Sequence, residues 1–377
     1  MKKKGYYIYF KLRESQAGVR RKIDDQMAVL GRHLDISELE IKKEKVNFIK
    51  GILSRLPFGS YAMDYDSVLS DIDNPDFVYI RHKALDHRYF LFLKKIKKRN
   101  PDVKIILEIP TYPYKGEILR NKTMWPFYFK DAFRRNRLKG VIERIATFSE
   151  DDTIFGIPTI KTQNGIMVDR FPVISKEKKK DSLNLIAVAS LLPYHGYERC
   201  ILGLSDYYSD LHNTKKEQIY LHIVGDGDEL RKYKEIVKKH KLESYVKFYG
   251  KLVGEELNAI FEDADIALGS FGMYKIDLNF SSQLKIREYL ARGLPVVSAC
   301  VEDVFQNANV DFYLNFANDN SNIDFNKISE FYHRLLPGDC DKKRLSERIR
   351  IFAENNVDMS IVMKPIINYI LGDENEY

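Results

Sequence analysis

One segment in the second half of the chain combines groups that can bind phosphate and ribose. Ser281 and Ser282 precede a stretch with helical periodicity, and a helix N-terminus directs backbone N–H groups toward an anion. Lys285 adds a positive charge close by. Glu288 lies farther along the same expected helix, where a carboxylate can accept two hydrogen bonds from a vicinal diol such as ribose. Taken alone, Glu288 is also compatible with an ordinary helix surface.

A second anion site is expected in the loop that follows the apolar run 185–189. The loop turns at Pro193 and opens a helix near Gly196, so backbone N–H groups and the helix dipole again face outward. His195 and Arg199 would add positive partners. Taken alone, Arg199 is more typical of a solvated helix.

Two other sets of residues are interpreted as structural. Gly225-Asp226-Gly227 ends a strand, but two glycines without the third of a dinucleotide fingerprint favour a tight turn over a phosphate site. Asp64-Tyr65-Asp66 and Asp71-Ile72-Asp73 have the spacing of an acidic metal motif. Neither follows a buried strand, so both are interpreted as loop acids, and we expect no metal site.

A segment of the first half interleaves aromatic and basic residues. It begins with Trp125 and continues through a run of aromatics to Arg134, Arg135 and Arg137. Such a sequence suits a membrane interface, where each cation near anionic lipid contributes roughly 1 kcal/mol. A site for single-stranded nucleic acid is an alternative, but no nucleic-acid signature accompanies the segment. The other alternative is a core-packing helix with a basic outer face.

Charge is unevenly divided along the chain. Residues 1–170 hold 34 Lys and Arg against 22 Asp and Glu, whereas the remainder holds 27 against 32. The basic half is expected to meet an anionic partner, with a solvated Lys-rich surface as the alternative. The three widely spaced cysteines fit neither a disulfide framework nor a metal site, which indicates a reducing compartment. No apolar run approaches about 18 residues, so any membrane attachment is expected to be peripheral.

Short apolar runs alternate with amphipathic segments of helical length in both halves of the chain, which is typical of parallel α/β sheets. At 377 residues, two domains are expected, 1–172 and 180–355, joined by the charged linker 173–182. The last apolar helix, within 356–377, is expected to pack back on the first domain. The strands expected are 6–10, 77–80, 104–109, 146–149, 185–189, 219–224, 246–249, 266–268 and 295–298.

With these elements in place, the block from Lys285 to Val297 resembles the donor-site signature of the retaining GT-B glycosyltransferases of bacterial family 4. That signature is an E-x7-E motif followed by Gly-x-Pro. Shorter stretches resemble the same family and are listed here: Gly18-Val19, Asn164-Gly165-Ile166, Gly225–Leu230, Gly250 and Ala264-Asp265. The resemblance implies two facing Rossmann-like doubly wound domains with a cleft between them. The first would bind the acceptor and the second a nucleotide sugar.

The resemblance also implies roles for individual residues. The residues expected to bind the donor are Ser190, His195, Arg199, Gly250, Ser281, Ser282, Leu284, Lys285 and Glu288. Catalytic roles are implied for His195, Arg199 and Lys285, and an acceptor-side role for Gly18. Near the place of the family's first-domain His, the polar residues are Glu108 and Tyr112, expected to be catalytic, and Glu117, expected on the acceptor side. Glu108, at a strand end, is equally compatible with a paired structural carboxylate. The implied chemistry is metal-independent hexosyl transfer with retention and without a cofactor.

A further resemblance links the chain to a subgroup that assembles capsular or exopolysaccharides. It is carried by His195–Arg199, Lys285–Leu290 and Glu108–Tyr114. It implies a saccharide acceptor on a polyprenyl diphosphate and a cytoplasmic protein, peripheral at the inner face of the cell membrane. No nucleic-acid partner is expected.

The chain departs from the family pattern at the first Glu, which is Phe280, and at the diphosphate-binding Arg and Lys, which are Ser190 and His195. The family's first-domain His has no evident counterpart. These departures motivate one alternative, a non-catalytic partner subunit of a glycosyltransferase pair. A nucleotide-sugar epimerase or a phosphorylase on the same architecture is a second alternative.

Overall fold

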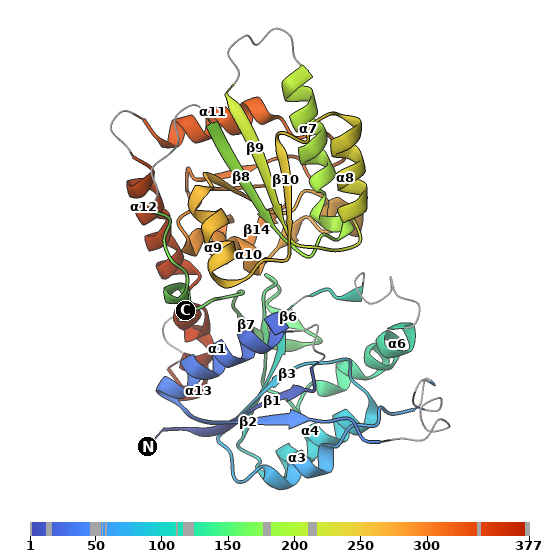
Figure 1. The fold of residues 1–377 in the computed structure, drawn as a ribbon. Coiled ribbons are helices and arrows are strands. Elements are labelled where there is room, and N and C mark those ends of the chain that lie inside the picture. Colours follow the sequence, from blue (N-terminus) through green and yellow to red (C-terminus); the bar gives the residue numbers. More distant parts are fainter. Residues whose placement is uncertain are drawn as a thin grey trace. The chain divides into compact units, whose positions relative to one another are not determined.

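Two parallel sheets organise the chain, each in its own unit. The computed structural model describes residues 2–12, 17–45, 54, 56, 59–110, 112–115, 124–175, 182–209, 217–337 and 341–373. Unit 1 comprises residues 1–164 and 359–377, and unit 2 comprises residues 165–358. Figure 1 shows a sheet flanked by helices in each unit.

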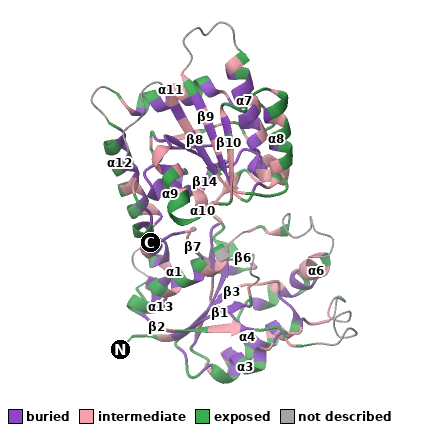
Figure 2. Ribbon diagram, in the orientation of Figure 1, coloured by how far each residue is buried: buried purple, intermediate pink, exposed green. Residues whose placement is uncertain are grey.

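The sheet of unit 1 has the order β2-β1-β3-β4-β5-β7-β6, parallel except for the final pair. Its strands are β1 (Lys4–Phe10), β2 (Asp35–Ile41), β3 (Phe77–Arg81), β4 (Lys104–Ile109), β5 (Arg144–Thr147), β6 (Thr153–Ile154) and β7 (Ile157–Lys161). The central strands β1, β3 and β4 are almost continuously buried, as expected of strands that helices cover on both faces. The buried strands appear in purple in Figure 2.

The main helices of unit 1 are α1 (Ala17–His33), α3 (Tyr65–Asp71), α4 (His87–Arg99), α6 (Trp125–Arg134) and α13 (Met359–Leu371). Carboxylate side chains cap the N-termini of two of these helices: Asp64 accepts a hydrogen bond from a backbone N–H of α3, and Asp86 does so for α4. The C-terminal helix α13 packs against α1, and Thr162 donates to the backbone oxygen of Val362.

The sheet of unit 2 is parallel, with the order β10-β9-β8-β11-β13-β15. Its strands are β8 (Ser182–Val188), β9 (Gln218–Val224), β10 (Val246–Gly250), β11 (Ile266–Leu268), β13 (Val296–Ser298) and β15 (Tyr313–Asn315). A separate pair joins β12 (Phe280–Ser281) to β14 (Val301–Glu302). The helices are α7 (Tyr197–Ser209), α8 (Leu230–Lys239), α9 (Gly254–Asp263), α10 (Leu284–Ala291), α11 (Phe325–Leu335) and α12 (Lys342–Asn356).

In each sheet, the chain first adds strands on one side of its first strand and then adds strands on the other side. In unit 2, β8, β9 and β10 proceed one way, and β11 and β13 then proceed the other way from β8. Because such crossovers are right-handed, α7 and α8 cover one face, and α9 and α10 cover the other. The reversal lies between β8 and β11 in unit 2 and between β1 and β3 in unit 1. In doubly wound sheets, ligands bind beyond the carboxyl ends of the strands at such points.

The observed division of the chain differs from the expected boundary at residue 172. Ile166, Val168 and Phe171 are buried in the core of unit 2, so the crossing from unit 1 falls at Asn164. On the return, Asp358 is the last residue of unit 2, and it accepts a hydrogen bond from the backbone N–H of Val168. Most of the expected linker, residues 176–181, lies outside the described residues.

Candidate functional site

The candidate site of unit 2 lies where the loops after β8 and β11 meet. Phe271 donates its backbone N–H to the oxygen of His195 at 2.8 Å, and Gly272 donates to Tyr194 at 3.2 Å. Gly196 has φ +64°, and a Cβ there would lie 2.4 Å from the backbone nitrogen of Gly272. The close approach of the two loops therefore requires glycine at position 196.

Lys285, Tyr197 and His195 form a cluster at this point. The Lys285 ammonium donates to the Tyr197 hydroxyl at 3.0 Å and to the backbone oxygen of Gly269 at 2.8 Å. The His195 ring stacks on the Tyr197 ring, with centroids 5.8 Å apart. Two of the predicted site residues are thus brought together by a tyrosine that the sequence did not single out.

Electrostatics set the charge states of this cluster. Burial, followed by the nearby Lys285 charge, lowers the pKa of His195 to about 2, so its ring is neutral. Its Nδ1 accepts the backbone N–H of Leu192 at 3.0 Å, which leaves the proton on Nε2 as a neutral donor. Burial also lowers the pKa of Lys285 to about 7, against a smaller opposing effect of Glu302. The lysine can therefore gain or lose its charge near neutral pH.

The helix α10 starts beside this cluster without a side-chain cap among the described residues. Gln283, at the cap position, instead directs its side chain to Glu302 and accepts a hydrogen bond from Ser270 at 2.6 Å. Ser281, Ser282 and Leu284 are all at least partly exposed around the helix start. The backbone N–H of Gln283 donates to Glu302 at 3.4 Å, and that of Ile286 donates to the backbone oxygen of Gln283 at 3.2 Å. An anion at this helix start would therefore meet the N–H groups of Leu284 and Lys285, and the anion site stays a prediction.

A buried polar network supports this helix start from below. Arg287, fully buried, forms ion pairs with Asp303 and, at 4.0 Å, with Glu302, and donates to the Ser282 hydroxyl at 3.1 Å. Burial raises the pKa of Glu302 to about 8, partly offset by Arg287. The network holds the loop that carries Ser281 and Ser282 in place, and Lys285 is not part of it.

Glu288, the predicted ribose ligand, is oriented by Arg292 one turn later. Its Oε1 accepts from Arg292 Nε at 3.1 Å and from Arg292 Nη2 at 3.0 Å, and its side chain is 24% exposed. The arginine is itself held over the rings of Phe261 and Phe171, at 4.1 and 5.4 Å. This arrangement fixes one carboxylate oxygen and leaves the other available to a ligand.

Arg199 does not take the predicted role of a diphosphate ligand. It is 2% exposed, and its Nη1 and Nε donate at 2.6 Å to the backbone oxygens of Phe271 and Ser321, respectively. Its Nη2 donates to the backbone oxygen of Ala317 at 3.0 Å and to Asp319 at 3.2 Å. Since all three guanidinium nitrogens are engaged, Arg199 fastens two loops together and has no catalytic or donor-binding geometry.

The glycine turn after β9 has the structural role that the sequence favoured. At Gly225, with φ +129°, a Cβ would lie 1.8 Å from the backbone oxygen of Ala189, so the turn packs against the loop after β8. Ser190, in that loop, is exposed. Gly250 accepts the backbone N–H of Gly225 at 2.7 Å. These residues shape the rim of the site and contribute no charge to it.

In unit 1, Glu108 is the centre of a buried charge cluster. It is fully buried at the carboxyl end of β4 and pairs with Lys22 and Arg81, each at 3.0 Å. Burial would raise the pKa of Glu108, but the two cations outweigh it and lower the pKa to about 2. Of the two interpretations, the paired structural carboxylate agrees with this geometry. The Arg81 side chain remains 19% exposed.

The other predicted residues of unit 1 are dispersed. Tyr112 packs against Tyr114 and Phe155, with ring centroids 6.2 and 5.8 Å apart. Gly18 is exposed in the first turn of α1, and nothing lies within 4 Å of a Cβ placed there. Glu117 lies outside the described residues. Among the residues of the aromatic and basic segment, Trp125 and Arg137 are exposed, Arg135 is partly buried and Arg134 is buried.

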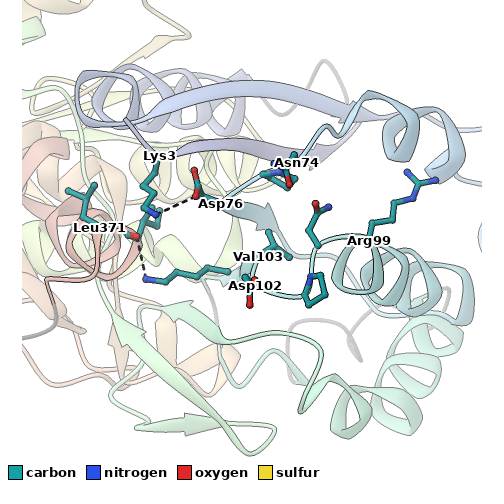
Figure 3. A pocket seen from close by; sticks show the side chains of 12 residues that line it. Lys3, Asn74, Asp76, Arg99, Asp102, Val103 and Leu371 are labelled. Carbon is teal, nitrogen blue, oxygen red and sulfur yellow. Dashed lines mark hydrogen bonds and ion pairs between the residues drawn. The ribbon is translucent and has the colours of Figure 1, made fainter. Parts of the chain in front are cut away.

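A cavity of about 380 Å³ lies at the opposite edge of the unit 1 sheet, near the amino ends of β1, β3 and β4. Figure 3 shows Lys3 paired with Asp76, at a distance of 3.3 Å. Lys104 donates to the end of α13 at 2.6 Å. This edge is not where doubly wound sheets bind ligands, and we assign no site to it.

Three of the four acids of the two acidic motifs have structural partners, and Asp66 and Asp71 lie in helix α3, not in a loop as expected. Asp64 caps α3, Asp66 pairs with Lys95 at 3.1 Å, and Asp73 pairs with Lys4 at 2.9 Å. No helix in the described part of the chain is both long and apolar enough to cross a bilayer.

Comparisons with known proteins agree with this architecture. Residues 184–322 match the family model described as glycosyl transferases group 1. A glycosyltransferase from Rickettsia africae ESF-5 superposes with a TM-score of 0.62 at 15% identity, covering 99% of this chain and 100% of that one. A search of curated proteins gives no match.

Two further solved structures have the same fold. HepE from Anabaena, solved with UDP and glucose, has a TM-score of 0.61 at 12% identity, covering 97% of this chain and 99% of that one. The sucrose-phosphate synthase from Thermosynechococcus elongatus has a TM-score of 0.62 at 11% identity, covering 98% and 100%. The predicted fold class is confirmed: the chain has the GT-B fold, with two Rossmann-like domains.

Several residues of the site were not identified from the sequence. Tyr197 contacts Lys285 and Arg292 contacts Glu288, which are both predicted donor-binding residues. Glu302 and Arg287 support the start of α10. Arg292 stands four residues after Glu288, a spacing that places two side chains on one helix face and could have indicated the pair. The partners of Lys285 and Arg287 are distant in sequence or in other elements, and no local pattern marks them.

Proposed function

We propose that the protein is a glycosyltransferase that binds a nucleotide-sugar donor in unit 2. The observation that carries the proposal is that Lys285, His195 and the start of α10, which no described side chain caps, lie together at the reversal point of the sheet. All of them lie within the segment that matches the glycosyltransferase family model. That related folds were solved with UDP or UDP-glucose supports a nucleotide sugar as donor.

Each group then has a chemical role. The open oxygen of Glu288 accepts the ribose hydroxyls, and the N–H groups at the start of α10 bind the diphosphate. Lys285 in its charged form, with the neutral His195 Nε2–H, stabilises the negative charge that develops on the leaving diphosphate. We infer hexosyl transfer with retention and without a metal ion or cofactor, as the family resemblance implies.

For the acceptor, we infer a saccharide carried on a polyprenyl diphosphate, used in the assembly of a capsule or other cell-surface polysaccharide. The protein would act in the cytoplasm, at the inner face of the membrane. The charge of unit 1 supports an anionic acceptor, because Lys22 and Arg81 outnumber Glu108 where the sheet reverses. Arg81 is the partly exposed member of this cluster and the group best placed to meet a phosphate.

Calorimetry with UDP-glucose on a matched set of variants tests the donor site. Glu288→Ala should weaken binding about 10- to 100-fold, the loss expected for hydrogen bonds to a charged group. Arg292→Met should give a smaller loss, because the carboxylate stays but is no longer oriented. Glu235→Ala, an exposed glutamate of α8, is the control and should leave affinity unchanged.

If Glu288→Ala binds UDP-glucose as tightly as the unchanged protein, the ribose assignment is wrong. If no UDP, GDP or ADP sugar binds at all, the donor proposal itself is wrong. Transfer is then assayed as donor-dependent product on a polyprenyl-diphosphate saccharide. Product formed without an acceptor would indicate an epimerase, and dependence on free phosphate would indicate a phosphorylase.

A non-catalytic partner subunit is the second candidate, and specific departures favour it. Phe280 replaces the family's first glutamate, Ser190 brings no charge, and Arg199 is fully engaged in structural hydrogen bonds. Such a subunit would bind a nucleotide sugar but form no product alone. Product formed by the purified chain with a lipid-linked acceptor would exclude it.

A further inference from the structure

Helix α6 turns its charged residues inward and its large aromatics outward. Lys130 and Asp131 are 1% and 0% exposed, whereas Trp125, Phe129 and Phe133 are 42%, 56% and 65% exposed. A surface helix of a water-soluble domain normally shows the reverse distribution. The three aromatics are spaced four residues apart and so form one stripe about 12 Å long on one side of the helix. We call it the aromatic stripe.

The buried polar groups hold the helix in this orientation. Asp131 accepts the backbone N–H of Leu85 at 2.9 Å and the Tyr114 hydroxyl at 2.5 Å. The ammonium of Lys130 donates to the backbone oxygen of Ser54. Rotating the helix to hide the aromatics would break these contacts and leave buried charges without partners, which is far costlier than exposing the rings. The exposure of the stripe is therefore fixed by the fold.

The described segment that carries the stripe, residues 124–140, contains exposed cations and no exposed carboxylate. Between residues 124 and 140, all of which are described, the only acid is the buried Asp131. Arg137 and Lys139 are exposed, and the Arg137 guanidinium lies 5.5 Å from the centroid of the Phe133 ring. An apolar stripe edged by positive charge complements a bilayer interface with anionic headgroups.

We propose that α6 docks unit 1 on an anionic lipid bilayer, with the aromatic stripe inserted among the headgroups and Arg137 and Lys139 on their phosphates. The sequence could not distinguish this arrangement from a core-packing helix with a basic outer face. The observed orientation excludes that alternative, because the outer face is aromatic. The inference deepens the proposed function, on which its link to a lipid-borne acceptor rests, but the docking surface uses unit 1 alone.

Vesicle flotation of the full chain tests the proposal. The unchanged protein should float with vesicles of phosphatidylglycerol and phosphatidylcholine and much less with phosphatidylcholine alone. Phe129→Gln with Phe133→Gln should lower the partition coefficient about tenfold for each ring. Arg137→Gln with Lys139→Gln should lower it about fivefold for each charge and reduce its salt dependence.

Two exposed apolar residues elsewhere provide matched controls. Leu91 is 40% exposed in α4 of unit 1, and Ile351 is 57% exposed in α12 of unit 2. Leu91→Gln and Ile351→Gln should float as the unchanged protein does. Because all these positions are exposed, the variants should fold, and circular dichroism of each preparation is the check.

The proposal is overturned if the unchanged protein does not float with anionic vesicles, or if the double phenylalanine variant floats equally well. It is also overturned if the unchanged protein is a dimer and the double phenylalanine variant is a monomer, since the stripe would then be a protein interface. UDP-glucose binding, measured on the same samples, reports separately on the donor site. Failure of docking and failure of the donor proposal are thus distinguishable.

Discussion

The charge state of Lys285 should make donor binding depend on pH in the neutral range. With a pKa of about 7, the lysine of the free protein is about 90% charged at pH 6 and about 10% charged at pH 8. The diphosphate of a nucleotide sugar favours the charged form and raises this pKa on binding. Affinity should therefore fall about tenfold from pH 6 to pH 8, and binding should take up a proton above pH 7.

Neighbouring groups that titrate in the same pH range would also change the pH dependence of donor binding. His195 stays neutral throughout, since its pKa is about 2, and burial raises the pKa of the Cys200 thiol, so it stays protonated. Glu302 does titrate, with a pKa of about 8, and its negative charge favours the charged lysine. Because the negative charge of Glu302 raises the pKa of Lys285, Glu302→Gln should shift the fall in affinity to lower pH.

Calorimetry with UDP-glucose from pH 6 to pH 9 measures the effect. A nucleotide sugar is preferred to UDP, because its diphosphate is esterified at both ends and lacks the ionisation near pH 6 of a terminal phosphate. Repeating each titration in two buffers of different ionisation enthalpy counts the protons taken up. Lys285→Met should lose about 10- to 150-fold at pH 6, where the lysine is charged, and much less at pH 8.

Two further variants separate charge from structure. Lys285→Arg keeps a positive charge at every pH and should bind without the decline, whereas Lys232→Met removes an exposed lysine and should keep the decline intact. An affinity of the unchanged protein that does not vary between pH 6 and pH 8 would refute the reasoning. So would a Lys285→Met variant with the same pH dependence as the unchanged protein.

Two remaining predictions concern stability. Replacing Glu108 by Gln leaves Lys22 and Arg81 buried or half-buried without their counter-charge and should cost about 3–5 kcal/mol in urea unfolding. Since folding lowers its pKa to about 2, its ionisation stabilises the fold above pH 4.5 and this contribution is lost as pH falls toward 2; an unchanged acid transition would contradict this. Gly225→Ala would place a methyl group 1.8 Å from a backbone oxygen and should lower the melting temperature by several degrees. Gly18→Ala, its control, meets nothing and should change stability by less than about 1 kcal/mol; equal melting temperatures would show that the turn is not tightly packed.

The central strands were predictable because they are buried on both faces. The expected strands 77–80 and 104–109 correspond to β3 and β4, whose apolar runs are continuous. β2 was missed, since it lies at the edge of the sheet and alternates half-exposed polar and apolar residues. The expected strand 146–149 is β5, which begins and ends two residues earlier.

The chemistry of the site was predictable only where it is local. The predicted anion site at Lys285 and the start of α10 rests on one short segment of sequence. The role of Arg199 does not, because its partners Phe271 and Ala317 lie 72 and 118 residues away. The same limit applies to α6: its helical period is local, but its orientation is set by Leu85, 46 residues from Asp131.

These differences change how the donor site balances charge. The sequence suggested that Arg199 and Lys285 together could replace the cations missing at Ser190 and His195. Arg199 donates its hydrogen bonds to backbone oxygens, and His195 is neutral. In the described cluster of Lys285, Tyr197 and His195, Lys285 is therefore the one cation that can contact a diphosphate. A second contribution must come from the backbone N–H groups at the start of α10, whose partial charge does not titrate. It follows that nucleotide-sugar binding should weaken but persist above pH 8, supported by the contacts that do not need the charge of Lys285: the helix start, the His195 Nε2–H and Glu288.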